Sequence, residues 1–249
     1  MSYLSKVRIN PMRQKSREML ANPRVTHAMV QAGIATQPVT ERTLWRMEAT
    51  DLHNPSLLIL TESRPDWTHV AEQAGWPHAD GDHFLIRDYT PLIETIAIGR
   101  EFAFKLTASP VQNTRTPDKL TPSQTARAVE RAESGQRRGY RLGHRTSAAQ
   151  TKWLVDRAPR NGFTIPTLHL DTGTPAPDMR IVHRGHRKFT KKEDQGERSV
   201  TFDTATFEGR LAITDRDLFC SAMLSGIGPA KSYGCGLLTL APLNQGSRS

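Results

Sequence analysis

Apolar and polar residues alternate at two places in the first half of the chain, which is typical of strands with one buried face. These segments cover residues 3–9 and residues 100–107. Between them, residues 42–49 and 56–62 predict two more strands. The first half is therefore expected to contain four strands.

Helices are expected between these strands. Residues 11–21 have a helical pattern, and a second helix is predicted from Pro23 to Ala32 because Asn22 is a good N-cap and proline suits the first helical position. Gly33 would end it, and a further helix is predicted to start near Asp66. The resulting order of strand, helix, strand, strand, helix, strand is ferredoxin-like.

The second half has a similar order of elements. We expect a helix at 147–157 with Trp153 and Leu154 facing inward, then a strand at 163–170, a long hairpin formed by 180–190 and 198–213, a helix at 215–224 and a last strand at 237–240. The predicted fold is α+β, with two tandem ferredoxin-like (RRM-like) domains. The expected division is a first domain at 1–112, a basic linker at 113–146, a second domain at 147–243 and a tail at 244–249.

The chain is strongly basic. Its 249 residues include 34 Lys and Arg against 25 Asp and Glu, a formal net charge of +9, and the isoelectric point is about 9.9. Such a balance favours a negatively charged partner, nucleic acid first, although a merely basic enzyme is the alternative.

Several other classes of protein are excluded by the same sequence. No apolar run is long enough for a transmembrane helix, and the alternating N-terminus does not match a signal peptide. The two cysteines, Cys220 and Cys235, form no Cys-x-x-Cys pair, which argues against a disulfide scaffold or a cysteine zinc site. We therefore expect a cytoplasmic protein with no membrane partner.

Basic residues are concentrated in two segments. The predicted linker is rich in arginine and is expected to contact phosphates, although a solvated connector is the alternative; its candidates are Arg137, Arg138, Arg141 and Arg145. The predicted hairpin carries a second set, namely Arg184, Arg187, Lys188, Lys191 and Lys192. Because aromatic residues make up only 6% of the chain, phosphate and shape recognition of a folded RNA fits better than base stacking on a sheet.

A glycine-rich stretch covers residues 226–236. It fails the Walker pattern because Ala230 precedes Lys231, and it fails the dinucleotide fingerprint because Lys231 takes the place of the third glycine. The predicted order, helix then loop then strand, is also wrong for both motifs. ATP and NAD are therefore rejected, and two interpretations remain: Lys231 and the loop amides bind a nucleic-acid phosphate, or the loop is a tight turn.

His27 is the candidate catalytic residue. In the predicted helix, Val25, Met29 and Ala32 form an apolar stripe, which leaves His27 facing solvent or ligand beside Arg24. The charge of Arg24 is expected to lower the pKa of His27, so that a neutral imidazole could act as a general base beside a cation. The alternative is an ordinary surface histidine.

A metal site is not expected. His183 and His186 have a His-x-x-His spacing, but in a strand residues three apart point to opposite faces. No cysteine or acidic pair accompanies them, and the chain contains no His-Glu-x-x-His motif. We therefore predict neither a metal nor a cofactor.

Four blocks of the sequence resemble the CasE family, the repeat-RNA endoribonucleases of type I-E CRISPR systems. They are Tyr3-Leu4-Ser5-Lys6-Val7, Leu20-Ala21-Asn22-Pro23 leading to His27, Phe207-Glu208-Gly209, and the stretch from Gly226 to Pro242. The resemblance spans nearly the whole chain, and its C-terminal block is the most specific. It implies two tandem ferredoxin-like domains and metal-independent cleavage of CRISPR precursor RNA at the base of each repeat hairpin.

The resemblance also implies roles for individual residues. His27 matches the family's catalytic histidine, and the hairpin of the second half matches the family's RNA-contacting arm. Two positions depart from the pattern. Some relatives have tyrosine where this chain has Arg24, and some have Arg-Ala-Asn-Pro where this chain has Thr107-Ala108-Ser109-Pro110. A tyrosine role in the active site is therefore not available, and the arginine contact is lost or supplied by Lys105 or Arg115.

The sequence thus predicts an RNA endonuclease in which the ribose 2′-hydroxyl attacks the phosphate, leaving a 2′,3′-cyclic phosphate and a 5′-hydroxyl. His27 would serve as general base or acid, and Arg24 would stabilise the charge on the phosphate. The expected partners are a CRISPR repeat RNA hairpin and other subunits of a type I-E effector complex. The alternative is a non-catalytic module of a ribonucleoprotein complex that binds structured RNA with the same basic surfaces.

Overall fold

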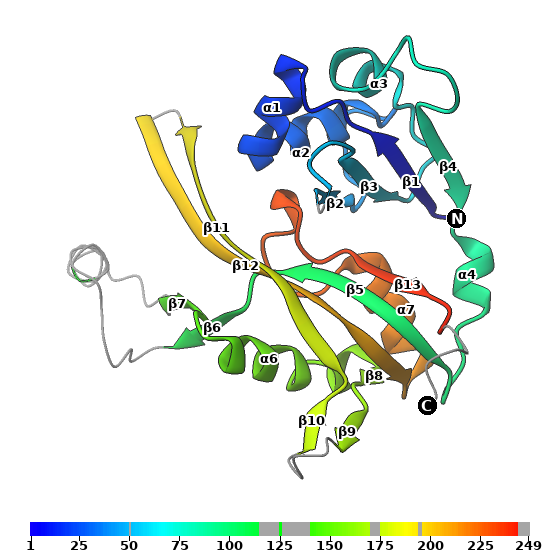
Figure 1. The fold of residues 1–249 in the computed structure, drawn as a ribbon, viewed down its shortest axis with the longest axis vertical. Coiled ribbons are helices and arrows are strands. Elements are labelled where there is room, and N and C mark those ends of the chain that lie inside the picture. Colours follow the sequence, from blue (N-terminus) through cyan, green and yellow to red (C-terminus); the bar gives the residue numbers. More distant parts are fainter. Residues whose placement is uncertain (50, 115–124, 126–139, 170–174, 194–195, 244–249) are drawn as a thin grey trace.

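The structure, a computed structural model, has a mixed α+β fold with several antiparallel sheets (Figure 1). It describes residues 1–49, 51–114, 125, 140–169, 175–193 and 196–243.

The first half of the chain forms a four-stranded antiparallel sheet with strand order β2-β3-β1-β4. Its strands are β1 (Tyr3–Arg8), β2 (Leu44–Glu48), β3 (Ser56–Thr61) and β4 (Phe84–Asp88). Helices α1 (Gln14–Ala21) and α2 (Pro23–Ala32) connect β1 to β2, and α3 (Thr68–Ala74) connects β3 to β4. We call β1 through β4, with these helices, the first unit.

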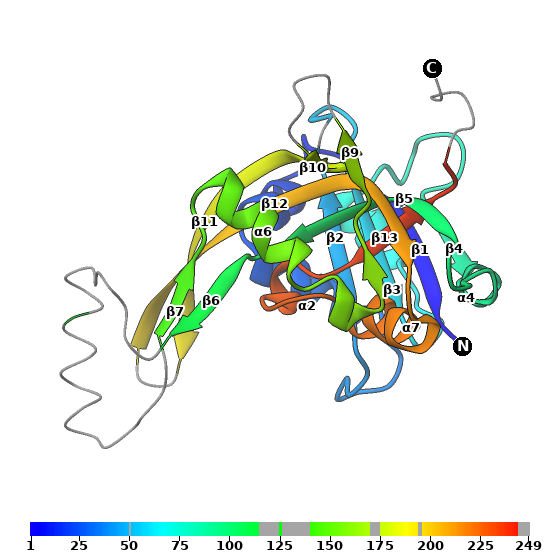
Figure 2. The same cartoon turned by 90° about the horizontal axis from the view of Figure 1, so that it is seen from below.

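A second sheet has the equivalent order, β11-β12-β5-β13, and β8 (Phe163–Thr164) pairs with β12 at one end. Its strands are β5 (Glu101–Ala108), β11 (Met179–Glu193), β12 (Gly196–Ile213) and β13 (Leu238–Ala241). Helix α6 (Ser147–Val155) follows β5, and α7 (Arg216–Ser225) follows β12. Both helices cover the face that points away from the first unit (Figure 2). We call this the second unit.

Smaller elements connect and extend the two sheets. They are α4 (Thr90–Glu94), the pair β6 (Val111–Thr114) and β7 (Tyr140–Gly143), the pair β9 (Thr167–His169) and β10 (Pro175–Pro177), and the single 3-10 turns η1 (Pro159–Asn161) and η2 (Lys231–Tyr233). None of the helices in the described ranges is long and apolar enough to cross a membrane.

The strand predicted at 100–107 exists, but its assignment to the first unit was wrong. As β5 it lies inside the second sheet, where it pairs with β12 on one side and β13 on the other. The unpredicted strand β4 completes the first sheet instead. The two sheets therefore divide before β5, not at residue 112.

Two further expectations need correction. The single strand predicted at 163–170 is two strands, β8 and β9, separated at Ile165 and Pro166, because proline lacks the N–H that a continuous ladder needs. Residues 113–114 and 140–143 of the predicted linker at 113–146 belong to the β6–β7 pair, so in chain order the linker falls between β5 and α6 of the second unit. Most of the remaining linker lies outside the described residues.

Strand β3 of the first sheet is buried on both faces. Val7, Leu57 and Ile59 point into a cluster formed with the helices of the first unit. Leu58 and Leu60, which alternate with them on β3, pack against the main core of the second unit. This double burial explains why β3 is a nearly continuous apolar run.

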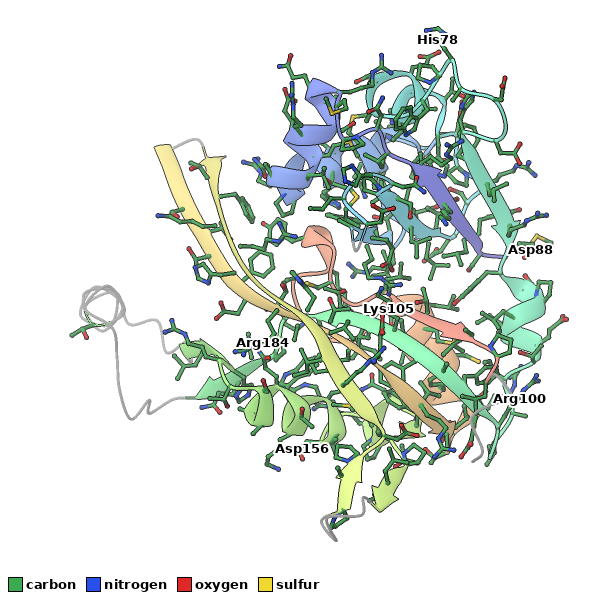
Figure 3. The ribbon with its side chains drawn as sticks, viewed as in Figure 1. His78, Asp88, Arg100, Lys105, Asp156 and Arg184 are labelled. Atoms are coloured by element: carbon green, nitrogen blue, oxygen red, sulfur yellow. The ribbon has the colours of Figure 1, made fainter. Side chains whose placement is uncertain are left out.

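Arg46 on β2 joins the two units at their centre. Its side chain is only 3% exposed, and its Nη1 donates to the carbonyl oxygens of Lys105 (3.0 Å) and Leu237 (2.9 Å). Nη2 donates to Thr239 Oγ1 (2.8 Å), and Nε forms an ion pair with Glu48 (2.6 Å). The guanidinium of Arg46, a residue of the first unit, therefore donates most of its hydrogen bonds to atoms of the second unit, beside Lys105 (Figure 3).

We expect Arg46→Ala to lower the free energy of unfolding by about 3 kcal/mol, since two carbonyls and a carboxylate at the junction lose a donor. For a chain of this length that corresponds to a fall in Tm of roughly 6–12 °C. Thermal unfolding followed by circular dichroism would measure it, with Arg87→Ala, an exposed arginine on β4, as the control. Equal Tm values for the two variants would show that Arg46 does not hold the units together.

Candidate active site and nucleic-acid interface

Helix α2 presents His27. The Asn22 side chain caps the helix by accepting a hydrogen bond from the Arg24 backbone N–H at 3.0 Å, and Pro23 occupies the first turn, as predicted. The buried face contains Pro23, Thr26 and Val30. Thr26 Oγ1 donates to the carbonyl of Met19 on α1 at 2.7 Å, which fixes the angle between the two helices.

The apolar stripe expected on α2 is shifted. Val25 and Met29 do pack against the core of the first unit, but Ala32 is exposed. Because the buried face is centred on Thr26 and Val30, His27 lies at its border and is half-buried, where the sequence predicted that it faces solvent or ligand.

His27 is partly desolvated. Its Nδ1 is buried and has no hydrogen-bond partner among the described residues. Burial lowers the pKa of His27 below its usual value, which favours the neutral imidazole. The direction agrees with the prediction, but the cause does not, because the charge of Arg24 is not responsible. Arg24 instead points to the long hairpin, where its Nη1 donates to the Thr190 carbonyl at 3.4 Å.

An open pocket of about 580 Å³ lies beside His27. Its walls come from α2, the segment leading into β2, the end of β3 and the turn η2 of the second unit. The side chains are mostly polar or charged: His27, Gln31, Val39, Thr40, Glu41, Arg42, Thr43, Glu62 and Ser232. Within the wall, Gln31 Nε2 donates to Thr43 Oγ1 at 2.7 Å.

The glycine-rich loop brings the second unit to this pocket. Gly226 and Gly234 have φ of +80° and +83°, which strongly favour glycine. A Cβ on them would lie 2.7 Å from Leu44 and from Trp45, two residues of β2, so no side chain fits there. The loop is therefore a tight turn, and it carries Lys231 and Ser232 to α2.

The predicted hairpin is formed by β11 and β12, and one of its faces turns toward α1 and α2 (Figure 1). On this face, Arg187 Nη1 donates to the Leu20 carbonyl at 3.5 Å. Phe189 and Phe202 pack on Tyr233 of η2, with ring centroids 4.9 and 5.6 Å away. The hairpin, α1 and the glycine-rich loop therefore meet next to the pocket.

The opposite face of the hairpin carries a second group of basic residues. His186 pairs with Asp203 at 2.6 Å, and Arg145 lies 3.9 Å from the same carboxylate. Arg184, which donates to the Arg145 carbonyl, lies where the hairpin passes α6 (Figure 3). Lys188 is exposed on the same face. The predicted basic arm thus has two faces, and among its basic side chains with defined positions Arg187 lies on the face toward α1 and α2.

Several predicted residues can be placed only in part. Arg137 and Arg138 lie outside the described residues. The backbone of Arg141 lies in β7, and the backbones of Lys191 and Lys192 lie in β11. In the ranges with defined positions, no three His, Cys, Asp or Glu side chains are grouped as a metal site would need.

Helical spacing predicts that Gln31, one turn after His27 on α2, lies on the same face as His27, and the structure places both in the pocket wall. The sequence did not indicate two other pocket residues, Arg42 and Ser232. Arg42 and Ser232 approach His27 only through the tertiary fold, and no local pattern marks them.

The chain was compared with known proteins. The family described as "CRISPR associated protein" matches residues 2–242. The CRISPR-associated endoribonuclease Cse3 of Thermus thermophilus is 27% identical over 245 residues, which is 96% of this chain and 100% of that protein. The Cascade subunit CasE of Escherichia coli is 52% identical over 218 residues, 80% of this chain and 94% of that protein. A structure of Cse3 bound to a 19-nucleotide RNA superposes with a TM-score of 0.70 at 25% identity, covering 97% and 99% of the two chains.

The desolvation of His27 has a measurable consequence. We expect its imidazole to titrate below the ordinary pKa of 6.5 in an NMR pH titration, with His27→Gln used to assign the resonance. The unfolded chain would bind this proton at a higher pH than the folded chain does. The free energy of unfolding should therefore be unaffected by His27 above pH 6.5 and should fall as the pH drops from 6.5 toward the pKa of His27 in the folded protein. A titration midpoint at or above 6.5 would mean that the ring is hydrated or paired with an acid.

Proposed function

Because this chain belongs to the Cse3/CasE (Cas6e) family of type I-E CRISPR endoribonucleases, we propose that it cleaves CRISPR precursor RNA at the base of each repeat stem-loop. The observation that carries the proposal is the position of His27. It is half-buried, its Nδ1 has no hydrogen-bond partner in the described part of the chain, and it lies in the wall of an open pocket shared by both units. A neutral imidazole in this environment suits proton transfer near pH 7.

The proposed reaction is an internal transesterification. The ribose 2′-oxygen forms a bond to the adjacent phosphorus while the bond from phosphorus to the 5′-oxygen breaks. One proton leaves the 2′-hydroxyl and one is delivered to the 5′-oxygen, so the products are a 2′,3′-cyclic phosphate and a 5′-hydroxyl. His27 performs one of these transfers as general base or acid, and the atoms balance without a metal or cofactor.

Arg24 is the proposed charge stabiliser on the same helix. It lies three residues before His27, so both side chains leave neighbouring turns of α2. Its guanidinium lies at the carbonyl of Thr190, between α2 and the hairpin, where an RNA strand entering the pocket would meet it.

The basic residues of the second unit are proposed to hold the RNA. They comprise the arginines of the segment before α6, those of the hairpin and the loop lysine: Arg137, Arg138, Arg141, Arg145, Arg184, Arg187, Lys188, Lys191, Lys192 and Lys231. The hairpin carries basic residues on both faces, and a two-stranded ribbon of this kind can lie along a groove of an RNA stem and contact its phosphates.

The architecture is consistent with this function. Each unit has the order strand, helix, strand, strand, helix, strand with its first strand in the middle of the sheet, and we infer that both are ferredoxin-like domains. CasE is named as a subunit of Cascade, and this chain is proposed to join a type I-E effector complex in the cytoplasm while retaining the hairpin product. A non-catalytic RNA-binding module with the same surfaces remains the alternative function.

The decisive variant is His27→Ala. We expect it to abolish cleavage of a labelled repeat hairpin RNA in excess EDTA, while the Kd for the RNA stays nearly unchanged, because the ring acts on protons rather than on RNA binding. His69→Ala, a half-buried histidine on α3 whose Nε2 contacts the Met29 carbonyl at 2.9 Å, is the matched control and should cleave.

The same assay with a 2′-deoxy sugar upstream of the expected cut tests the nucleophile. The wild-type protein should bind this RNA and leave it intact. If it cuts the deoxy RNA, the 2′-hydroxyl is not the nucleophile. If it binds both RNAs and cuts neither, the non-catalytic module is the better description.

The hairpin contacts predict a change in salt dependence. Lys188→Ala should weaken RNA binding modestly and reduce the magnitude of the slope of log K against log [salt] by about 1, as expected for the loss of one phosphate contact. Lys152→Ala on α6, whose ammonium is paired with Asp156 at 2.9 Å, should leave the slope unchanged. Equal slopes for wild type and Lys188→Ala would remove Lys188 from the interface.

A further inference from the structure

The pocket beside His27 contains a cation that the proposed mechanism has not used. Arg42 lines the pocket and its side chain is exposed. It precedes the buried start of β2, so its backbone is anchored while its guanidinium extends into solvent at the pocket wall. Arg24, by contrast, is turned toward the hairpin.

A second cation, Lys231, lies across the junction in η2. It is half-buried next to Ser232, which shares the pocket wall with His27. Burial, and then the positive charge of Arg42, lower the pKa of Lys231. Two like charges therefore face each other across the boundary between the units, which is unfavourable unless an anion lies between them.

The acids of the pocket do not neutralise this pair. Glu41 accepts hydrogen bonds from the backbone N–H groups of Glu62 and Ser63, both at 3.1 Å. Glu62 accepts one from the backbone N–H of Arg42 at 3.4 Å. Neither carboxylate forms an ion pair with Arg42 or Lys231, and no other acid in the described part of the chain does so. The acids thus hold the backbone of Arg42 in place and leave both cations available.

The backbone before Lys231 is also unusual. Ala230 has a φ of +62° and is the one residue other than glycine with positive φ among those described. This conformation is unfavourable for alanine, and such strain is common where a side chain must be held in a functional position. It starts the turn η2, in which Lys231 directly precedes the pocket residue Ser232.

We infer that Arg42 and Lys231 form the anion site that holds the scissile phosphodiester beside His27, with Arg42 stabilising the negative charge that develops on its non-bridging oxygens during cleavage. The inference rests on the proposed function and states where the scissile phosphate of the RNA substrate binds. A guanidinium suits this role because it can donate two parallel hydrogen bonds to phosphate oxygens.

The test separates catalysis from binding. Arg42→Ala is expected to slow single-turnover cleavage at saturating protein about 100-fold, while the Kd for the uncleavable 2′-deoxy RNA rises by no more than about threefold. Arg42→Lys should recover part of the rate, because it restores the charge without the paired donors. Arg87→Ala, on the edge strand opposite β2, is the matched control and should cleave at the wild-type rate.

A wild-type rate for Arg42→Ala would overturn the inference and leave the proposed function intact. A loss of affinity with an unchanged saturated rate would also overturn it, since Arg42 would then bind RNA away from the reacting phosphate. If the wild-type protein does not cleave at all, the proposed function fails first.

A second readout does not depend on cleavage. Inorganic phosphate added to the wild-type protein should shift the NMR signals of the Lys231 side chain saturably, and Arg42→Ala should weaken this response at least tenfold. In the absence of phosphate, Arg42→Ala should raise the pKa of Lys231, because a neighbouring positive charge is removed. If the wild-type protein shows no saturable response to phosphate, the anion site is overturned, whether or not the RNA is cut.

Discussion

The buried guanidinium of Arg46 is the interaction on which the arrangement of the two units depends. It belongs to β2 but is satisfied by β5, by Thr239 of β13 and by the carbonyl of Leu237. Leu237 directly follows the glycine-rich loop, so the same side chain that joins the sheets also fixes the end of that loop. Removing a charge from water is costly, and the cost is offset only if every donor finds a partner. This requirement gives the two units one relative position.

That position creates the pocket. Neither unit contains it alone, because His27 and Arg42 come from the first and Ser232 from the second. The glycines of the loop allow the close approach, since Gly226 and Gly234 lie against Leu44 and Trp45 where no side chain would fit. The partial burial of His27, which sets its protonation, is thus a property of the junction as much as of α2.

The sequence predicted what is encoded locally. The Asn22-Pro23 cap, the basic hairpin and the helix with Trp153 and Leu154 were all confirmed because each depends on neighbours in the chain. The sheet to which β5 belongs was predicted wrongly, because an alternating pattern indicates a buried face but not the strands with which it pairs. For the same reason, Arg42 and Ser232 were missed and the low pKa of His27 was ascribed to Arg24 rather than to burial.

The placement of β5 has a consequence for synthesis on the ribosome. The first sheet is complete once residue 88 has emerged, because all its strands lie within Tyr3–Asp88. β5 emerges soon afterwards but has to wait for β12 and for β13, whose Thr239 is 134 positions beyond Lys105. Until then its alternating apolar residues have no partner, and strands exposed in this way are prone to wrong association. Because the first unit precedes β5 along the chain, all strands of its sheet are available before the second sheet can be completed.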